Sequence, residues 1–600
     1  MPATADRSGR SYPLAEELDG FLGDPEDPGG WFSYARCVEL DEKEEFPADI
    51  CRRLDDWGLP AHYVPVRHGG RLTDYEQMLQ LMRTVARRDL TVAIGHGKTY
   101  LGGVCVWVAG TPEQAARLGA DIRAGVPVSL GLTERAHGSD LLAGEVHGVP
   151  DGTGWLVNGE KWLINNATRG GLLSLLTRTD PAGGPRAFSV LLVDKRALDK
   201  LDRTAYRHLP KNLTHGIRGA DISGIAFDDA PVDRSALVGA EGAGLEIVLK
   251  ALQLTRTMCA ALSLGAADHG LRIVLDFARE RELYGRRLID LPQARHQLGT
   301  AAADVLLHEA LATVAARLVH TQTGELSITS AVTKYLLPSG TEDVLTRLTR
   351  LLGARAYLKG VHADGMFQKV ERDHRIVGMF DGNTLVNLNS LINQFRSLVR
   401  GRRRGTGDTA GAEAAYDLSA PLPELDVSRL SLVARGGSGV LAGLGTSVDR
   451  LTELARQRPE LAPAAKAAGR IKDVAERVHE EMAAWQGLVD GVPPAAFDTA
   501  RRYTLCHCAA VCLGLWTHSA PLFAGTTTEP LWRDGLWLRA ALDRLLTRLG
   551  EPDTGDDEAY EELLGRLVAA RSSGELFSLH PHRLPSAPPR RAADATTARN

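Results

Sequence analysis

Several features that would place a protein in a specialised class are scarce or missing in this chain. Its formal net charge is −5, so no surplus of basic residues indicates binding to nucleic acid. The longest apolar runs, such as residues 508–516, are too short to cross a membrane, and the first residues lack the apolar stretch of a secretory signal. We therefore expect a cytoplasmic protein with no membrane span and no nucleic-acid partner.

Cysteine is also rare. The chain has 7 cysteines, an odd and scattered set that is typical of reduced thiols in a cytosol. Cys508 and Cys512 share one helical face, but buried structural cysteines are commoner than metal ligands in such a place, so we expect no metal site. The others are Cys37, Cys51, Cys105, Cys259 and Cys506.

The chain does contain an ordinary globular composition spread over 600 residues. Apolar residues make up 44% and charged residues 24%, which is usual for soluble domains. This length exceeds what a single hydrophobic core serves, so we expect about two to four folding units.

The hydrophobic pattern changes twice along the chain. It has a helical period up to about residue 124, where Thr111 predicts a helix N-cap ahead of Pro112 and Glu113. It then becomes β-like, and "GWLVNGEKWLI" (154–164) predicts two short strands around a hairpin turn at Asn158-Gly159. From Gly244 the helical period returns. A β segment between two helical blocks predicts an α+β architecture.

The predicted organisation follows from these changes and from composition. A stretch rich in Gly and Arg separates the helical bundle from a further helical block, and the final residues have the composition of a disordered tail. The predicted segments are an N-terminal arm (1–40), an N-terminal helical domain (41–128), a middle β domain (129–235), a helical bundle (236–400), a linker (401–420), an additional all-α domain (421–580) and the tail (581–600).

Three segments together resemble the acyl-CoA dehydrogenase family. "LGLTERAHGSD" (130–140) is similar to the family's Thr-Glu-Pro-x-x-Gly-Ser-Asp strand and loop, and "GWLVNGEKWLINNA" to its Asn-Gly-x-Lys-x-x-Ile-Thr-Asn hairpin. The third runs from the long helix containing "LTRTMCAALSLG" to "VERDHRIVGMFDGNT", similar to the family's Arg-Asp and Tyr-Glu-Gly-Thr turns. The resemblance covers about residues 40–400 and implies a helical domain, a β-barrel-like domain and a helical bundle, here with the extra helical domain.

The resemblance also implies a reaction, the FAD-dependent α,β-dehydrogenation of an acyl thioester. In the family a Glu on the Tyr-Glu-Gly-Thr turn takes the α-proton, and Asp381 stands at that position here. Asp is one methylene shorter, so the pocket would have to bring the substrate closer. Gly382 supplies backbone freedom beside it. Thr255 and Arg256 lie where some members carry the base on the long helix, which leaves no substitute carboxylate there. The alternative for Asp381 is a helix cap without catalytic function.

Cofactor and substrate residues are implied position by position. Leu132 and Thr133 would contact the isoalloxazine, and Ser139 would reach the FAD phosphate or the substrate. Leu163 replaces the family's Trp against the ring, and Asn165 replaces the Thr near N5, where an amide can still donate or accept. Further FAD contacts are implied for Arg281, Tyr284, Gln293, Arg350, Gly353, Asn383 and Thr384. Of these, Arg281 corresponds to the Arg that reaches a neighbouring subunit's FAD pyrophosphate.

The same resemblance implies partners. The acyl group could be carried by coenzyme A or by an acyl-carrier protein, and electrons would pass to an electron-transfer flavoprotein. Long-chain members with an added helical domain form dimers, so we expect a homodimer. Two alternatives stay open: a flavoenzyme of the same fold with oxidase, monooxygenase or non-redox cyclisation chemistry, and a non-catalytic flavoprotein.

Overall fold

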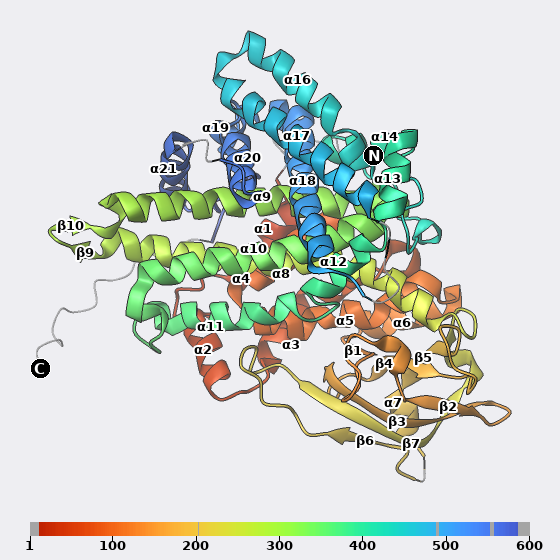
Figure 1. Ribbon diagram of the computed structural model, residues 1–600. Helices are drawn as coiled ribbons and strands as arrows, with labels where there is room; N and C mark the ends of the chain where they lie inside the picture. The colour runs from red at the N-terminus through yellow and green to blue at the C-terminus, as the bar shows by residue number, and fades with distance from the viewer. Residues whose placement is uncertain (1–10, 202, 486, 488–490, 553–556, 586–600) are drawn as a thin grey trace, which may run out of the picture.

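The computed structural model describes residues 11–201, 203–485, 487, 491–552 and 557–585. A long helical bundle lies at its centre (Figure 1). The β domain lies on one side of this bundle, and the C-terminal helices, in blue, lie on the opposite side. The predicted α+β class with an additional helical domain is confirmed.

The N-terminal domain is helical because its apolar residues recur at helical spacing and polar residues mark the breaks. Asp89 ends α4 and begins α5, with its side chain accepting a hydrogen bond from the Val92 amide. Thr111 caps α6 as predicted, in a reciprocal capping box with Gln114. The helices are α1 (Pro13–Leu22), α2 (Tyr34–Glu42), α3 (Ala48–Trp57), α4 (Tyr75–Arg88), α5 (Leu90–Ala109) and α6 (Pro112–Arg123).

The N-terminal segment differs from the predicted arm. Residues 13–22 form α1, which buries Leu18 and Leu22 and packs on α4. The apolar spacing of a short amphipathic helix was hidden there among Gly, Pro and acidic residues. Residues 1–10 of the predicted arm lie outside the described residues.

The β domain is one twisted sheet with the strand order β6-β7-β3-β2-β4-β5-β8, and β1 pairs in parallel with β4. It has a core of its own around Trp155, Val157 and Phe227. The strands are β1 (Val128–Gly131), β2 (His147–Pro150), β3 (Gly154–Asn165), β4 (Leu172–Arg178), β5 (Phe188–Asp194), β6 (Tyr206–Leu209), β7 (Ile222–Asp233) and β8 (Leu237–Val238), with the short helix α7 (Lys195–Leu198) after β5.

The predicted hairpin at Asn158-Gly159 is wrong. β3 runs straight through these residues and pairs with β7, with a register shift between Val157 and Gly159. The Asn158 amide donates to Asp229 across the two strands at 2.8 Å, and Gly159 has φ +112°. The Asn-Gly pair therefore forms a β-bulge. The positive φ that glycine adopts easily, and that a hairpin turn would need, is used here by the bulge.

The central bundle contains α8 (Gly244–Glu280), α9 (Pro292–Thr321), α10 (Leu326–Leu352), α11 (Met366–His374), α12 (Thr384–Ile392) and α13 (Phe395–Arg404). By length and composition α8 could cross a membrane, but 89% of its most apolar window is buried inside the protein. Its hydropathy is explained by its neighbours, because α4, α5, α9 and α10 pack around it. Between α8 and α9 the chain forms a hairpin of β9 (Glu282–Leu283) and β10 (Arg286–Arg287).

The C-terminal domain packs on the bundle through α18, α20 and α21, which contact α9. The predicted linker is folded in part, because α14 lies within it and buries Ala412, Ala415 and Tyr416. The helices are α14 (Thr409–Tyr416), α15 (Gly439–Ala442), α16 (Leu444–Gln457), α17 (Ala462–Ala484), α18 (Pro494–Ser519), α19 (Glu529–Trp532), α20 (Leu536–Arg548) and α21 (Asp557–Ser573). In the predicted tail, residues 581–585 pack against the protein with His582 buried, and 586–600 lie outside the described residues.

Candidate active site

Asp381 lies on a tight turn between α11 and α12. It has φ +54° and is followed by Gly382 at φ +93°, so both residues are in the left-handed region. The N-cap of α12 is Asn383, whose side chain accepts a hydrogen bond from the Val386 amide at 2.9 Å. The capping alternative for Asp381 is therefore wrong. Its side chain is 8% exposed and turns into the protein.

Two buried cations hold the backbone of this turn. Arg256 of α8 donates from Nε to the Asp381 carbonyl at 2.7 Å, and Lys334 of α10 donates from Nζ to the Gly382 carbonyl at 3.2 Å. Burial lowers the pKa of both cations. A Cβ on Gly382 would lie 2.7 Å from Arg256 Nη2, so Gly382 allows the guanidinium to approach. These contacts fix the position of the Asp381 backbone.

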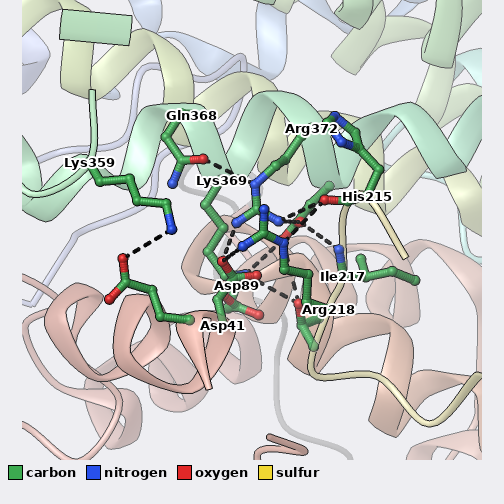
Figure 2. Close-up of polar contacts among 12 residues, drawn as sticks. Asp41, Asp89, His215, Ile217, Arg218, Lys359, Gln368, Lys369 and Arg372 are labelled. Atoms are coloured by element: carbon green, nitrogen blue, oxygen red, sulfur yellow. Dashed lines mark hydrogen bonds and ion pairs between the residues drawn. The ribbon is translucent and has the colours of Figure 1, made fainter. Parts of the chain in front are cut away.

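The helix before the turn is anchored by buried charges. Figure 2 shows Lys369 and Arg372 of α11 reaching between Asp89 and Asp41 of the N-terminal domain. Lys369 Nζ lies 2.5 Å from Asp89 Oδ2 and 2.7 Å from Asp373 Oδ2. Burial alone would lower the pKa of Lys369, but the adjacent aspartates outweigh it and raise that pKa.

The same anchor reaches the β domain. Asp373 accepts a hydrogen bond at 2.6 Å from the Ile217 amide in the loop between β6 and β7. Arg372 donates to the His215 carbonyl at 3.1 Å (Figure 2). One short helix thus ties together the N-terminal, middle and bundle domains close to Asp381.

The Asp381 carboxylate faces a small cavity of about 50 Å³ between α4, α5 and α8. Lys98 Nζ lies 3.2 Å from Asp381 Oδ1, and Cys259 Sγ lies 3.7 Å from Oδ2. Burial raises the pKa of the Cys259 thiol to about 12, with a further contribution from Asp381. The rest of the lining is mainly apolar and consists of Met78, Met82, Ala93, Ile94, Gly97, Tyr100, Leu101, Thr255, Met258, Leu262 and Phe380.

Lys98 is the site residue that sequence reasoning missed. It lies in α5, between Gly97 and Thr99 in a helix whose other residues are mostly apolar and buried. Its ammonium lies 3.7 Å from the centre of the Phe380 ring, which turns a face toward it. A single lysine within a 20-residue apolar helix was the available signal.

A second part of the predicted site is the end of β3. Leu163 is forced outward by a register shift between Trp162 and Ile164, has φ +55° and is 40% exposed. Asn165 Oδ1 is buried and has no hydrogen-bond partner among the described residues. An exposed apolar side chain beside an unsatisfied amide oxygen fits a bound flavin ring, which offers an apolar face and polar edge atoms.

This strand end is joined to both the loop after β1 and the cavity helix. The Trp162 amide donates to the Thr133 carbonyl at 2.9 Å, and Lys161 Nζ donates to the Leu132 carbonyl at 3.0 Å. Asn166 Nδ2 donates to the Gly95 carbonyl of α5 at 2.8 Å. Leu132, Thr133, Leu163 and Asn165 are therefore brought together, close to the helix that carries Lys98. Ser139 lies on the exposed loop that follows.

The remaining predicted FAD residues lie elsewhere. Arg281, Tyr284 and Gln293 lie at the β9–β10 hairpin and the start of α9, where Tyr284 is 95% exposed. α8 has 37 residues and is therefore about 55 Å long; it joins the β domain at one end to this hairpin at the other (Figure 1). Arg350 and Gly353 lie at the C-terminal end of α10, and both are exposed. Asn383 and Thr384 stay beside Asp381 at the start of α12.

Comparisons with known proteins agree with this architecture. Residues 34–125, 129–230 and 242–395 match the N-terminal, middle and C-terminal domains of acyl-CoA dehydrogenases. The chain is 24% identical over 371 residues to the cyclohex-1-ene-1-carbonyl-CoA dehydrogenase of Syntrophus aciditrophicus, a match that covers 61% of this chain and 84% of the relative.

Two solved structures extend the comparison. The Bacillus anthracis acyl-CoA dehydrogenase complexed with FAD superposes with a TM-score of 0.65 at 16% identity, covering 93% of this chain and 94% of that one. The prolyl acyl carrier protein oxidase AnaB superposes with a TM-score of 0.58 at 18% identity, covering 64% of this chain and 98% of that one. The first match includes the C-terminal helical domain. The chain belongs to the acyl-CoA dehydrogenase family, a family of FAD-dependent oxidoreductases that act on CH–CH bonds.

Proposed function

We propose that this protein oxidises the Cα–Cβ bond of an acyl thioester, with Asp381 as the base that takes the α-proton. The observation that supports this most directly is the direction of the Asp381 side chain, which is 8% exposed and lines a mainly apolar cavity. A carboxylate in that place has little access to water and can meet a C–H bond of a group that enters the cavity. Bound FAD would accept the hydride from the β-carbon.

The residues around Asp381 have distinct tasks in this proposal. The left-handed turn, held by Arg256 and Lys334, sets the position of the carboxylate. This position compensates for the side chain of Asp, which is one methylene shorter than that of Glu. The positive charges around the turn favour a substrate whose thioester oxygen gains negative charge as the α-proton leaves. Met78, Met258 and Leu262 keep water away from the reacting carbon.

FAD would be held at the end of β3, by Thr133 and Leu132 from the preceding loop and by Leu163 and Asn165 from the strand. The unsatisfied Asn165 oxygen and the exposed Leu163 side chain support this placement. Ser139 on the adjoining loop is in a position to contact phosphate or substrate. Asn383 already serves as a helix cap, so a direct FAD contact would have to come from its amide nitrogen or from Thr384.

We also propose that the enzyme is a homodimer in which Arg281 and Gln293 of one copy serve the FAD of the other. Two features support this: the length of α8 between the two groups of FAD residues, and the exposed Tyr284 and Tyr357 at the far end. Co-expression of Arg281→Ala and Asp381→Asn chains tests it. A mixed dimer has one site with both residues intact, so activity should return well above that of either variant alone. No recovery would contradict a shared site.

The acyl carrier and the electron acceptor follow from the same proposal. Coenzyme A or an acyl-carrier protein could carry the substrate, and the solved carrier-protein oxidase of the same fold supports testing both. We propose an electron-transfer flavoprotein as acceptor and the cytoplasm as location. Mixing reduced enzyme with oxygen distinguishes an oxidase or a monooxygenase, which would reoxidise within the catalytic cycle.

The deciding experiment follows the oxidised-flavin absorbance under anaerobic conditions with a panel of acyl-CoA and acyl-carrier thioesters. At least one class should bleach the band. Asp381→Asn should bind FAD equally but bleach about 10²- to 10⁴-fold more slowly, which is the usual contribution of a general base. Asp449→Asn, an exposed aspartate on α16 beside Lys472, is the matched control and should react like the wild type. Equal bleaching by Asp381→Asn would refute the assignment of the base.

A further inference from the structure

An ammonium group lines the mainly apolar cavity that the Asp381 carboxylate faces. Lys98 is 11% exposed, and its Nζ is 3.2 Å from Asp381 Oδ1. The lining of the cavity includes Met78 and Met82 of α4, Ile94 of α5 and Met258 of α8. A purely hydrocarbon acyl chain has no need of a cation there, and burying one is costly unless it is paired.

The charges at this end of the cavity do not cancel. Lys98, Arg256 and Lys334 all lie within hydrogen-bond distance of residues 381–382, and Asp381 is the carboxylate that they share. Arg256 and Lys334 are occupied by backbone carbonyls of the turn. Lys98 is different, because its ammonium donates to the carboxylate that must react, at 3.2 Å.

Protonation of Asp381 during the proposed reaction would break its ion pair with Lys98. When Asp381 takes up the α-proton it becomes neutral, and Lys98 then remains as a buried cation without its counter-ion. A buried charge that loses its partner is strongly disfavoured. A substrate that brings its own anion to Lys98 removes this obstacle and also frees Asp381 Oδ1 to receive the proton.

The distance between Lys98 and Asp381 sets the position of such an anion. Both residues line the cavity, and Lys98 Nζ lies only 3.2 Å from Asp381 Oδ1. An anion bound to this ammonium therefore lies only a few bonds from a carbon atom that faces the carboxylate. A substituent at the end of a short chain would therefore meet Lys98.

We propose that Lys98 is a specificity-determining residue that selects short acyl thioesters bearing a carboxylate on the acyl chain, and that this carboxylate displaces Asp381 from Lys98. The inference rests on the proposed function for the role of Asp381, but the recognition of the anion by Lys98 can be measured without turnover. Charge-assisted hydrogen bonds of this kind change affinity by about tenfold or more.

Binding is measured first, in an Asp381→Asn background that blocks the reaction. Titration of the FAD-loaded variant with glutaryl-CoA and with pentanoyl-CoA compares chains of equal length with and without the carboxylate. Glutaryl-CoA should bind at least tenfold more tightly. The double variant Lys98→Met/Asp381→Asn should lose this preference, and Lys98→Arg/Asp381→Asn, which keeps the charge, should retain it. Equal affinities for the two thioesters in Asp381→Asn would overturn the proposal.

Turnover is measured second, with the same pair of thioesters. Wild-type enzyme should favour glutaryl-CoA in kcat/KM, and Lys98→Met should shift the ratio toward pentanoyl-CoA by at least tenfold. Lys250→Met, which removes an ammonium from the surface pair with Glu246 on α8, is the control and should leave the ratio unchanged. If no thioester bleaches the flavin, the proposed reaction fails while the binding ratio still decides the role of Lys98. An unchanged preference in Lys98→Met would refute it.

Discussion

At the scale of single residues, the turn at 381–384 divides its tasks among neighbours. Asp381 faces the cavity, Gly382 makes room for Arg256, and Asn383 begins the next helix. An Asp and an Asn within three positions are both plausible caps in the sequence, since both residue types are favoured there. The structure distinguishes them by where each side-chain oxygen points.

Asn383 is expected to stabilise the first turn of α12 as its N-cap. Asn383→Ala should cost α12 about 1 kcal/mol, because the Val386 amide loses its acceptor. Hydrogen exchange at the start of α12, read by mass spectrometry of a peptide that covers it, should become several-fold faster. Asn383→Ser keeps an acceptor oxygen and should exchange nearly like the wild type. If Ala and Ser behaved alike, the hydrogen bond would have no measurable value for the helix.

At the scale of elements, the position of the turn depends on how α11 is held. Lys369 donates to Asp89, at the junction of α4 and α5 (Figure 2). It also donates to Asp373 of its own helix. Each of these three side chains is buried. A buried group of opposite charges is stable only while every partner is present. Removing the cation takes from Asp89 its ion-pair partner and leaves Asp373 with Arg372, whose Nη1 lies 3.4 Å from Asp373 Oδ1.

Lys369→Met should therefore destabilise the protein by about 3–5 kcal/mol. The expected result is a large fall in the midpoint of urea unfolding, with an earlier loss of bound FAD because the turn at Asp381 loosens. Lys359→Met is the control, since Lys359 pairs at 3.5 Å with Glu42 and both side chains are about half exposed. That change should cost less than about 0.5 kcal/mol. Similar midpoints for the two variants would contradict an anchoring role for the buried network.

At the scale of the whole molecule, buried histidines couple folding to pH. Burial lowers the pKa of His308, His374 and His507 to about 3. They lie in α9, α11 and α18, so both the bundle and the C-terminal domain contain histidines whose protonation at acidic pH favours unfolding. In the unfolded chain their pKa returns to about 6.5. The unfolded state thus binds more protons than the folded state at any pH between these values.

The free energy of unfolding should therefore fall as the pH is lowered. The stability contribution is complete above about pH 6.5 and is lost as the pH falls toward 3, by about 1.4 kcal/mol per pH unit for each histidine. Urea unfolding at pH 7 and pH 5 should show a marked loss at the lower pH. His507→Leu should reduce that loss, because its imidazole nitrogens have no hydrogen-bond partners among the described residues. His147→Gln, at an exposed position, serves as the control. An equal pH dependence in all three proteins would show that burial of these rings is not the cause.

The amino-acid sequence by itself determined the α+β order, the cap at Thr111, the family and the carboxylate at 381. These depend on local pattern: helical period, turn residues and short motifs carry them within a few neighbouring positions. The tertiary structure decided that Asn158-Gly159 is a bulge, that α14 fills the supposed linker and that Asn383 caps α12. It also brought Lys98 to Asp381 across 283 positions. Such a contact depends on how α5 packs beside α8, and the spacing of residues along the sequence does not predict this packing.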